Sequence, residues 1–546
     1  MPLAAVCFPE PALVVAPSFL RFARFPNLYF MTGVTSKSPS AKSVDSSYGQ
    51  ILKASSILGG TQVLVYLISL IKNKVAAVLL GPGGVGLIGL YTSAISMVAI
   101  AAGLGLNSSG VREVAEAEAS KDARKVARVT LVLRRLCWLS GFVGWLVTIA
   151  LAWPLSRWTF GSTDKALHIV LLGSTVMLGA IAGGQAALLQ GMRRIADLAK
   201  VNLLCVVAGT IISIALYAWA GARGVVPALI LAAAASTLVN WFFARMVKVE
   251  PCQLSWYETF RQAGPLLRLG LALTWNGLLV TAVAFVARAL IVRETGLDAS
   301  GLYQAAWTIS GMFSGFVLSA MSADFYPRLA GVSEDNVALK RLVNEQTEVG
   351  LLLALPGILG TLVFAPALLE LLYTSKFVPA ADLLPWFLTG VFIQVISWPI
   401  GFVLLAKSQS FTFAWVETVI QGAQVTMIYL LVSRFALVGA AAAFALTQCI
   451  HIGLYFAVVR HKAGFGWNKS VMRLLATCAF FMLAGLLLHF FAAGWTRLVA
   501  GAVVVGACGM FALGKLLGMV DPSTRIGKLI WGVPFARTLA GAGRSH

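Results

Sequence analysis

Apolar runs long enough to cross a lipid bilayer dominate this chain. A helix that spans the hydrocarbon core needs about 20 mainly apolar residues, and windows of that length predict fourteen such helices. Nearly every residue from position 54 on falls in or beside one of them. The predicted spans are 54–80, 84–108, 133–157, 165–190, 199–222, 224–246, 266–292, 298–325, 346–373, 378–405, 411–433, 436–459, 470–492 and 495–519.

Composition agrees with this pattern. Hydrophobic residues make up 59% of the 546 positions and charged residues only 12%, which is more apolar surface than a soluble domain could bury. We therefore predict an all-α integral membrane protein. The seven Cys and five His residues show no spacing typical of disulfides or metal sites, so we expect neither a metal nor a cofactor.

The chain contains the trace of an internal duplication. Shifting it by 215 positions aligns Gly81 with Gly296 and Gly224 with Gly439, together with the ends of the corresponding spans. Chance matches among many glycines and alanines are the alternative. A duplication of six spans each predicts two pseudo-symmetric six-helix bundles related by an axis along the membrane normal.

This organisation divides the chain into six parts. We expect, in order, a tail that is disordered or precedes the true start (1–50), the first bundle (51–248), a cytoplasmic linker (249–265), the second bundle (266–462), an extra helix pair (463–520) and a cytoplasmic tail (521–546).

Charge predicts the orientation. Lys and Arg number 42 against 21 Asp and Glu, and basic residues collect in cytoplasmic loops. Most of them fall on one side of the membrane when both termini are cytoplasmic. The excess also favours contact with anionic membrane lipids. No basic domain is present, so we expect no nucleic acid partner.

Cations lie inside the predicted spans, where a charge is costly. The offset of 215 places Arg288 opposite Asn73, which stands between Lys72 and Lys74. We predict that Arg288, Arg293 and one of the two lysines face a water-filled cleft and bind an anion. The alternatives are snorkelling of these long side chains to the outer interface and, for Arg293, a local ion pair with the residue that follows it.

Four carboxylates are candidates for coupling transport to an ion gradient. Glu417 lies several residues inside a span and is the first choice. Asp324 has a pairing partner one turn on in Arg328, and Glu348 and Glu370 lie near span ends, where an interfacial role is the alternative.

Three neutral polar residues lie within spans. The offset superposes Thr61 on Asn276, and Gln185 lies in the fourth span. These side chains could bind sugar hydroxyls of a substrate or join helices by hydrogen bonds. We find no nucleotide-binding loop, nucleophile elbow or metalloprotease motif, so we predict no catalytic residues and no enzyme.

Several stretches carry a resemblance to a known family. "ILGGTQVLVYLISLIKNKVAAVLLGPGGVGLIGLY", "GLGLNSSGVREVAE" and "ALLQGMRRIADLAKVN", followed by "LVGAAAAFALTQCIHIGLYFAVVRHKAGFGW", resemble Wzx-type flippases, the polysaccharide branch of the multidrug/oligosaccharidyl-lipid/polysaccharide transporter superfamily. The likeness extends over about residues 50–462.

The resemblance implies a function. It implies alternating access and an undecaprenyl-pyrophosphate-linked oligosaccharide, such as an O-antigen, capsule or exopolysaccharide repeat unit, moved across the bacterial inner membrane with an H⁺ or Na⁺ gradient. A polysaccharide polymerase and chain-length proteins are further expected partners.

The extra helix pair departs from the usual twelve spans and keeps other functions open. These are a multidrug/cation antiporter of the same superfamily, a lipid-linked peptidoglycan-precursor flippase and, lastly, a membrane polysaccharide polymerase or ligase.

Overall fold

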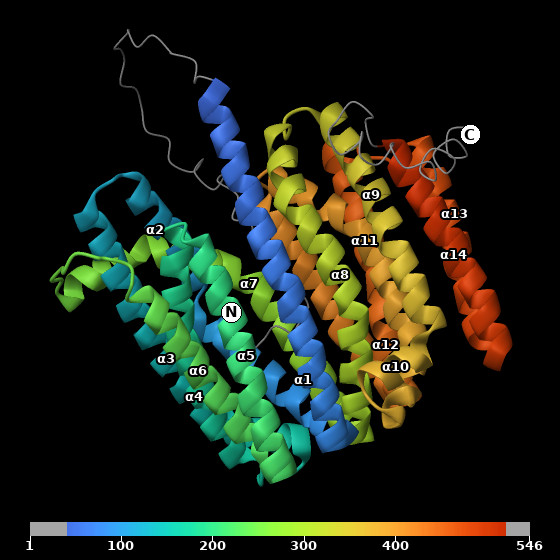
Figure 1. Ribbon diagram of the computed structural model, residues 1–546, viewed down its shortest axis with the longest axis horizontal. Coiled ribbons are helices and arrows are strands. Elements are labelled where there is room, and N and C mark those ends of the chain that lie inside the picture. The colour runs from blue at the N-terminus through green and yellow to red at the C-terminus, as the bar shows by residue number, and fades with distance from the viewer. Residues whose placement is uncertain (1–40, 520–546) are drawn as a thin grey trace.

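The computed structural model describes residues 41–519 as a bundle of helices (Figure 1). Its side chains are described from residue 60 on, except at 265, 268, 269, 271–273, 313, 314 and 316–324. The helices are α1 (Ala41–Gly103), α2 (Leu106–Ala119), α3 (Ala123–Phe160), α4 (Ala166–Gly191), α5 (Ile195–Ala220), η2 (Gly221–Gly224), α6 (Val225–Ala244), α7 (Trp256–Thr295), α8 (Leu297–Gly331), α9 (Asn336–Val363), α10 (Ala365–Leu372), η3 (Ser375–Leu383), α11 (Leu384–Ala406), α12 (Ser410–Ala463), α13 (Lys469–Phe491) and α14 (Gly494–Met519). Of the predicted tails, 1–50 and 521–546, residues 1–40 and 521–546 lie outside the described residues, whereas residues 41–50 form the start of α1.

The surface of the bundle is apolar. Large side chains such as Trp219 and Phe411 are 84% and 88% exposed, an arrangement that lipid favours and water does not. Ten helical runs of the described chain are long and apolar enough to cross a bilayer. The predicted all-α, multi-pass membrane protein is confirmed.

The predicted spans are not all separate helices. α1 and α12 each contain two predicted spans and are interrupted at single residues, Gly81 and Ala436. Gly81 has φ 65° and is followed by Pro82, and proline is well suited to the first turn of the next helix. A single residue with positive φ therefore separates two helical segments at a place where the sequence pattern predicted a loop.

Equivalent backbone breaks recur at the offset of 215. The end of α4 matches the end of α11, and the start of α5 matches the start of α12. Three residue pairs at the same offset have positive φ. They are Gly81 (65°) with Gly296 (92°), Arg193 (55°) with Ser408 (57°), and Gly221 (55°) with Ala436 (48°).

Matched caps begin two of the long helices. The Asp122 side chain accepts a hydrogen bond of 2.9 Å from the backbone N–H of Arg124 before α3. The Asp335 side chain accepts one of 2.8 Å from Val337 before α9. Both aspartates satisfy backbone donors that a helix start leaves unpaired.

Two glycine contacts join the part of the chain before residue 249 to the part after it. A Cβ on Gly86 would collide with the backbone oxygen of Leu297, and one on Gly301 with that of Pro82. A Cβ on Gly105 would collide with the backbone oxygen of Gly270. We call the end of the bundle with the contact between Gly86 and Gly301 the Gly81 end, because Gly81 lies beside it in α1. The end with the contact between Gly105 and Gly270 is the Gly105 end. In Figure 1, α1 runs between the group α3–α6 and the group α8, α9, α11 and α12.

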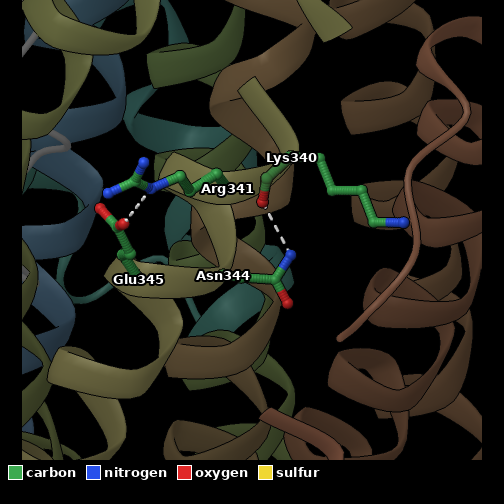
Figure 2. Close-up of polar contacts among 4 residues, drawn as sticks. All are labelled: Lys340, Arg341, Asn344 and Glu345. Atoms are coloured by element: carbon green, nitrogen blue, oxygen red, sulfur yellow. Dashed lines mark hydrogen bonds and ion pairs between the residues drawn. The ribbon is translucent and has the colours of Figure 1, made fainter. Parts of the chain in front are cut away.

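The last two helices, α13 and α14, lie at one edge of the molecule (Figure 1) and are fastened to α9. Figure 2 shows Asn344 of α9 donating to the backbone oxygen of Lys340 at 2.7 Å. The Asn344 Oδ1 also accepts from the backbone N–H of Asn468, just before α13, at 3.0 Å. Arg497 of α14 donates to the backbone oxygen of Leu362 at 3.2 Å. Polar contacts therefore fix the pair near both ends of α9.

A short connection precedes α7. Arg135 of α3 donates to the backbone oxygen of Leu254 at 2.9 Å and to the Thr259 hydroxyl at 2.7 Å. Ser255 and Glu258 form a capping box at the start of α7. Hydrogen bonds from the backbone and then the side chain of Ser255 lower the pKa of Glu258, because they stabilise its charged form.

Candidate functional site

Arg288 is the most deeply buried of the predicted cations. It lies in α7, eight residues before the break at Gly296, and is 2% exposed. Its Nε donates to Oε1 of Gln304 at 2.9 Å, and its Nη1 donates to the backbone oxygen of Ala284 at 2.8 Å. The guanidinium carbon lies 5.8 Å from the ring centre of Tyr303. All of these partners are neutral. Among the described side chains, no carboxylate forms an ion pair with Arg288.

Three helices meet around this arginine. The side-chain Nε2 of Gln304, in α8, donates a hydrogen bond to the hydroxyl of Thr308 at 3.2 Å. A Cβ added to Gly89 of α1 would lie 2.6 Å from Oε1 of Gln304. Glycine at this position therefore leaves room for the side chain that holds Arg288. The guanidinium lies close to the junction of α1, α7 and α8.

The two lysines have different surroundings. Lys74 Nζ donates to the backbone oxygen of Glu370 at 2.8 Å, in the last turn of α10, where a helix end carries partial negative charge. This bond links α1 to the second half of the chain. Lys72 is half-buried, and the described residues offer it no hydrogen bond or ion pair.

Arg293 is exposed at the Gly81 end. It borders a cavity of about 300 Å³ between the end of α3 and the connection from α7 to α8. The cavity is lined by Thr159, Phe160, Gly161, Val292, Arg293, Gly296 and Leu297. Arg293 therefore adds positive charge to a small opening near the contact between Gly86 and Gly301.

Glu417 lies in a buried polar cluster within α12. The residue is 8% exposed, and its Oε1 accepts a hydrogen bond from the Tyr455 hydroxyl at 2.6 Å. Nε2 of His451 lies 3.9 Å from the same oxygen. Glu417 belongs to the segment before Ala436, whereas His451 and Tyr455 belong to the segment after it. The described residues contain no group of three or more His, Cys, Asp and Glu side chains that could hold a metal ion.

A comparison with known families decides the class of the protein. The family described as a polysaccharide biosynthesis protein matches residues 75–382, more than half of the chain. This chain belongs to that family. The predicted resemblance to the polysaccharide branch of the transporter superfamily is thereby confirmed.

Individual relatives agree with the family. The chain is 25% identical over 402 residues to the Lipid III flippase of Escherichia coli (strain K12), covering 70% of this chain and 92% of the relative. The fold resembles the Lipid II flippase MurJ in an inward closed conformation, with a TM-score of 0.65, 11% identity and coverage of 84% of this chain and 99% of that one. It also resembles an inward-facing multidrug resistance MATE transporter, with a TM-score of 0.59, 18% identity and coverage of 73% and 94%. The relatives are transporters, which supports the prediction that this family member is not an enzyme.

The other predicted residues of this family member are dispersed. Lys74 and Glu370 are brought together, but through the backbone oxygen of Glu370, whose residue is exposed. The remaining half-buried residues are Thr61 on α1, Gln185 on α4, Asn276 on α7 and Glu348 on α9. The side-chain oxygens of Gln185 and Asn276 are buried and accept no hydrogen bond from the described residues. The side chain of Asp324 lies outside the described residues.

Sequence reasoning missed the partners of Arg288 and Glu417. The pattern offered no signal for Gln304, because its contact with Arg288 depends on how α8 returns after Gly296. A signal did exist for Tyr455. Glu417 and Tyr455 are equally distant from Ala436, and a helical hairpin that turns at that residue places them at the same depth. His451 lies one turn before Tyr455 and therefore shares its face.

Proposed function

We propose that this chain flips an undecaprenyl-pyrophosphate-linked oligosaccharide from the inner to the outer leaflet of the bacterial inner membrane by alternating access. Family membership and the Lipid III flippase relative support a lipid-linked cargo. A pyrophosphate cannot cross the hydrocarbon core without a polar path, because burying its charge is prohibitive. The prenyl chain can stay in lipid while the charged head passes between the two halves.

Arg288 is the observation that carries this proposal. An arginine keeps its charge in proteins, and a buried charge without a counter-ion is unfavourable. The described partners of Arg288 are a carbonyl, an amide oxygen and an aromatic ring. This charge can be compensated by an anion that enters between α1, α7 and α8. A guanidinium also matches phosphate oxygens with two parallel hydrogen bonds.

The remaining predicted residues have subordinate roles in this proposal. Lys72 and Arg293 add positive charge at the Gly81 end, which we assign to the outer face of the membrane. The bond from Lys74 to α10 has to break when that end opens. Both termini are then cytoplasmic, and the chain crosses the membrane fourteen times in two six-helix bundles, 51–248 and 266–462, followed by the extra pair.

Glu417 is the carboxylate that we propose for coupling to an ion gradient. It is the most buried of the described candidates, and an ionisable residue inside a membrane span is commonly functional. Thr61, Asn276 and Gln185 remain candidates for contacts with sugar hydroxyls. A multidrug/cation antiporter would require a carboxylate near Arg288 to attract cationic drugs, and the described surroundings of Arg288 contain none.

Replacement of Arg288 tests the proposal. In a bacterial strain that lacks its own flippase for lipid-linked oligosaccharides, we expect Arg288→Ala to reduce surface polysaccharide about tenfold to a hundredfold. The reason is that hydrogen bonds to a charged group contribute about 1.5–3 kcal/mol. Arg288→Lys should restore part of this loss, because it keeps the charge without the fork of donors. Surface polysaccharide is measured by gel electrophoresis.

The matched control is Arg341→Ala. Arg341 is an exposed arginine of α9 whose Nε lies 2.7 Å from Glu345 (Figure 2), and its loss should leave polysaccharide unchanged. Membrane protein level and the size-exclusion profile in detergent must match the unmutated protein in every variant. Normal polysaccharide in the Arg288→Ala strain would contradict an anion-binding role.

A further inference from the structure

We propose that Glu417, Tyr455 and His451 form a proton-binding site, and that the ion coupled to transport is the proton. This inference deepens the proposed function, on which its role in coupling rests. The site lies entirely within α12, between the segment that begins at Ser410 and the segment that follows Ala436. It is therefore separate from Arg288, which lies between α7, α8 and α1.

The composition of the cluster favours a proton over an alkali cation. Among the described residues Glu417 is its single carboxylate, and that carboxylate accepts a hydrogen bond from Tyr455. A hard cation needs several oxygen ligands that point toward it. Here one of the neighbours is an imidazole nitrogen, from His451 at 3.9 Å. Nδ1 of His451 has no hydrogen-bond partner among the described residues.

Among the described side chains, the elements packed against the cluster add no charged group within ion-pair distance of Glu417. α11 contains no Asp, Glu, Lys or Arg between its bounds, and its Gly401 faces the Tyr455 ring. α7 contributes Trp275, whose indole N–H donates to the Thr418 hydroxyl at 3.1 Å. α8 contributes Tyr326, which belongs to the same buried cluster as Tyr455. Among the described groups, His451 is thus the titratable neighbour at ion-pair distance from Glu417.

The equivalent positions in the first half of the chain carry neutral polar residues in place of the ionisable side chains. The offset of 215 places Asn202, Ser236 and Asn240 at the positions of Glu417, His451 and Tyr455. Asn240 donates to the backbone oxygen of Ser236 at 2.9 Å. Ser236 and Asn240 are buried, so the fold accommodates neutral polar side chains at these positions without a carboxylate or an imidazole. In the second half, the same positions carry the Glu417 carboxylate and the His451 imidazole.

The chemical step is a simple proton transfer. When His451 is an imidazolium, a proton on its Nε2 passes to the Glu417 carboxylate, which leaves a neutral imidazole and a neutral carboxylic acid. A hydronium ion from the aqueous phase then returns a proton to the imidazole and leaves a water molecule. The hydroxyl of Tyr455 loses a charged acceptor, and a neutral hydrogen bond is about half as strong as a charge-assisted one. The link between the two segments of α12 weakens on protonation, and this change biases their arrangement around Ala436.

Infrared difference spectroscopy of the purified full chain tests the inference without any substrate. Spectra in detergent micelles are compared between alkaline and acidic buffer, in sodium chloride and in choline chloride. We expect a protonated-carboxyl band at acidic pH that is independent of sodium and is lost in Glu417→Gln. In Tyr455→Phe the band should move to higher frequency, because the carboxyl loses a hydrogen bond. After a rapid drop in pH, His451→Gln should form the band more slowly, on the order of a hundredfold.

Two variants provide controls. Glu345→Gln removes an exposed carboxylate of α9 (Figure 2), and Asn240→Ala changes the residue that the offset of 215 places at Tyr455. Both should keep the band. A band that survives Glu417→Gln, or one that sodium removes, would overturn the inference. An unchanged rate in His451→Gln would overturn the proton relay. Because no cargo is present, these results do not depend on the flippase assay, and a failed flippase assay with an intact band would refute the proposed cargo alone.

Discussion

The two halves of this protein share a backbone and differ in chemistry at equivalent places. Gly221 and Ala436 have nearly the same φ, and both lie between consecutive membrane helices. On the two segments that the second break joins, a carboxylate, a phenol and an imidazole lie close together. On the segments that the first break joins, the offset puts neutral side chains at those positions. The turning points recur at the offset of 215, whereas the side chains at equivalent positions of the two halves differ.

The same contrast applies to the buried arginine. Arg288 and Gln304 of the second half occupy the positions of Asn73 and Gly89 in the first. Gly89 also provides the space into which Gln304 extends. The asymmetry is therefore complementary, because a small residue in one half accommodates a large polar residue in the other. A symmetric pair of long side chains would not fit at this junction.

The largest effect should follow from giving the second half the chemistry of the first. We expect Glu417→Asn to reduce gradient-driven transport between the leaflets of proteoliposomes on the order of a hundredfold, because the carboxylate proposed for coupling is lost. The matched variant Asn202→Ala should retain most transport. Movement of a labelled lipid-linked oligosaccharide from one leaflet to the other under an imposed proton gradient measures both. Equal activity of the two variants would show that the halves do not differ in coupling.

Exchanging the residues at the two breaks should change stability in opposite directions. Ala436 has φ 48°, a conformation that costs a residue with a Cβ about 1–2 kcal/mol and costs glycine little. Ala436→Gly should therefore stabilise the protein by about 1 kcal/mol. Gly221→Ala should destabilise it by about 1–2 kcal/mol, since open space surrounds the added methyl and only the backbone conformation opposes it. Thermal unfolding in detergent measures both, and changes of the same sign would refute equivalent strain.

The smallest effect is expected for the helix caps, a feature in which the two halves should be alike. Asp122→Ala and Asp335→Ala each remove a cap from a long helix, and each should cost about 1 kcal/mol. Glu334→Ala, next to the second cap but outside its hydrogen bonds, should change stability by less than about 0.5 kcal/mol. Thermal unfolding again provides the measurement. Unequal costs of the two aspartate variants would indicate that the starts of α3 and α9 are not equivalent.

The sequence predicted the membrane class well because long apolar runs follow directly from the thickness of a bilayer. It also found Gly81 and Gly296 as equivalent points, since a residue with positive φ favours glycine. It could not find Ala436 in the same way, because alanine carries no signal of a left-handed backbone. Arg288 and Glu417 were recognisable as charges inside spans. Their neighbours were not, because Gln304 and Tyr455 are common residues whose importance depends on how two helices return past each other.

The contact between Gly86 and Gly301 has a mechanical consequence. Each glycine faces backbone atoms of the opposite helix, so the two surfaces meet there without interlocking side chains. Tilting one helix against the other at this point requires no side chain to leave a rotamer well. α1 and α8 can therefore rotate against each other about this contact, and the side chains packed around it limit the angle of rotation.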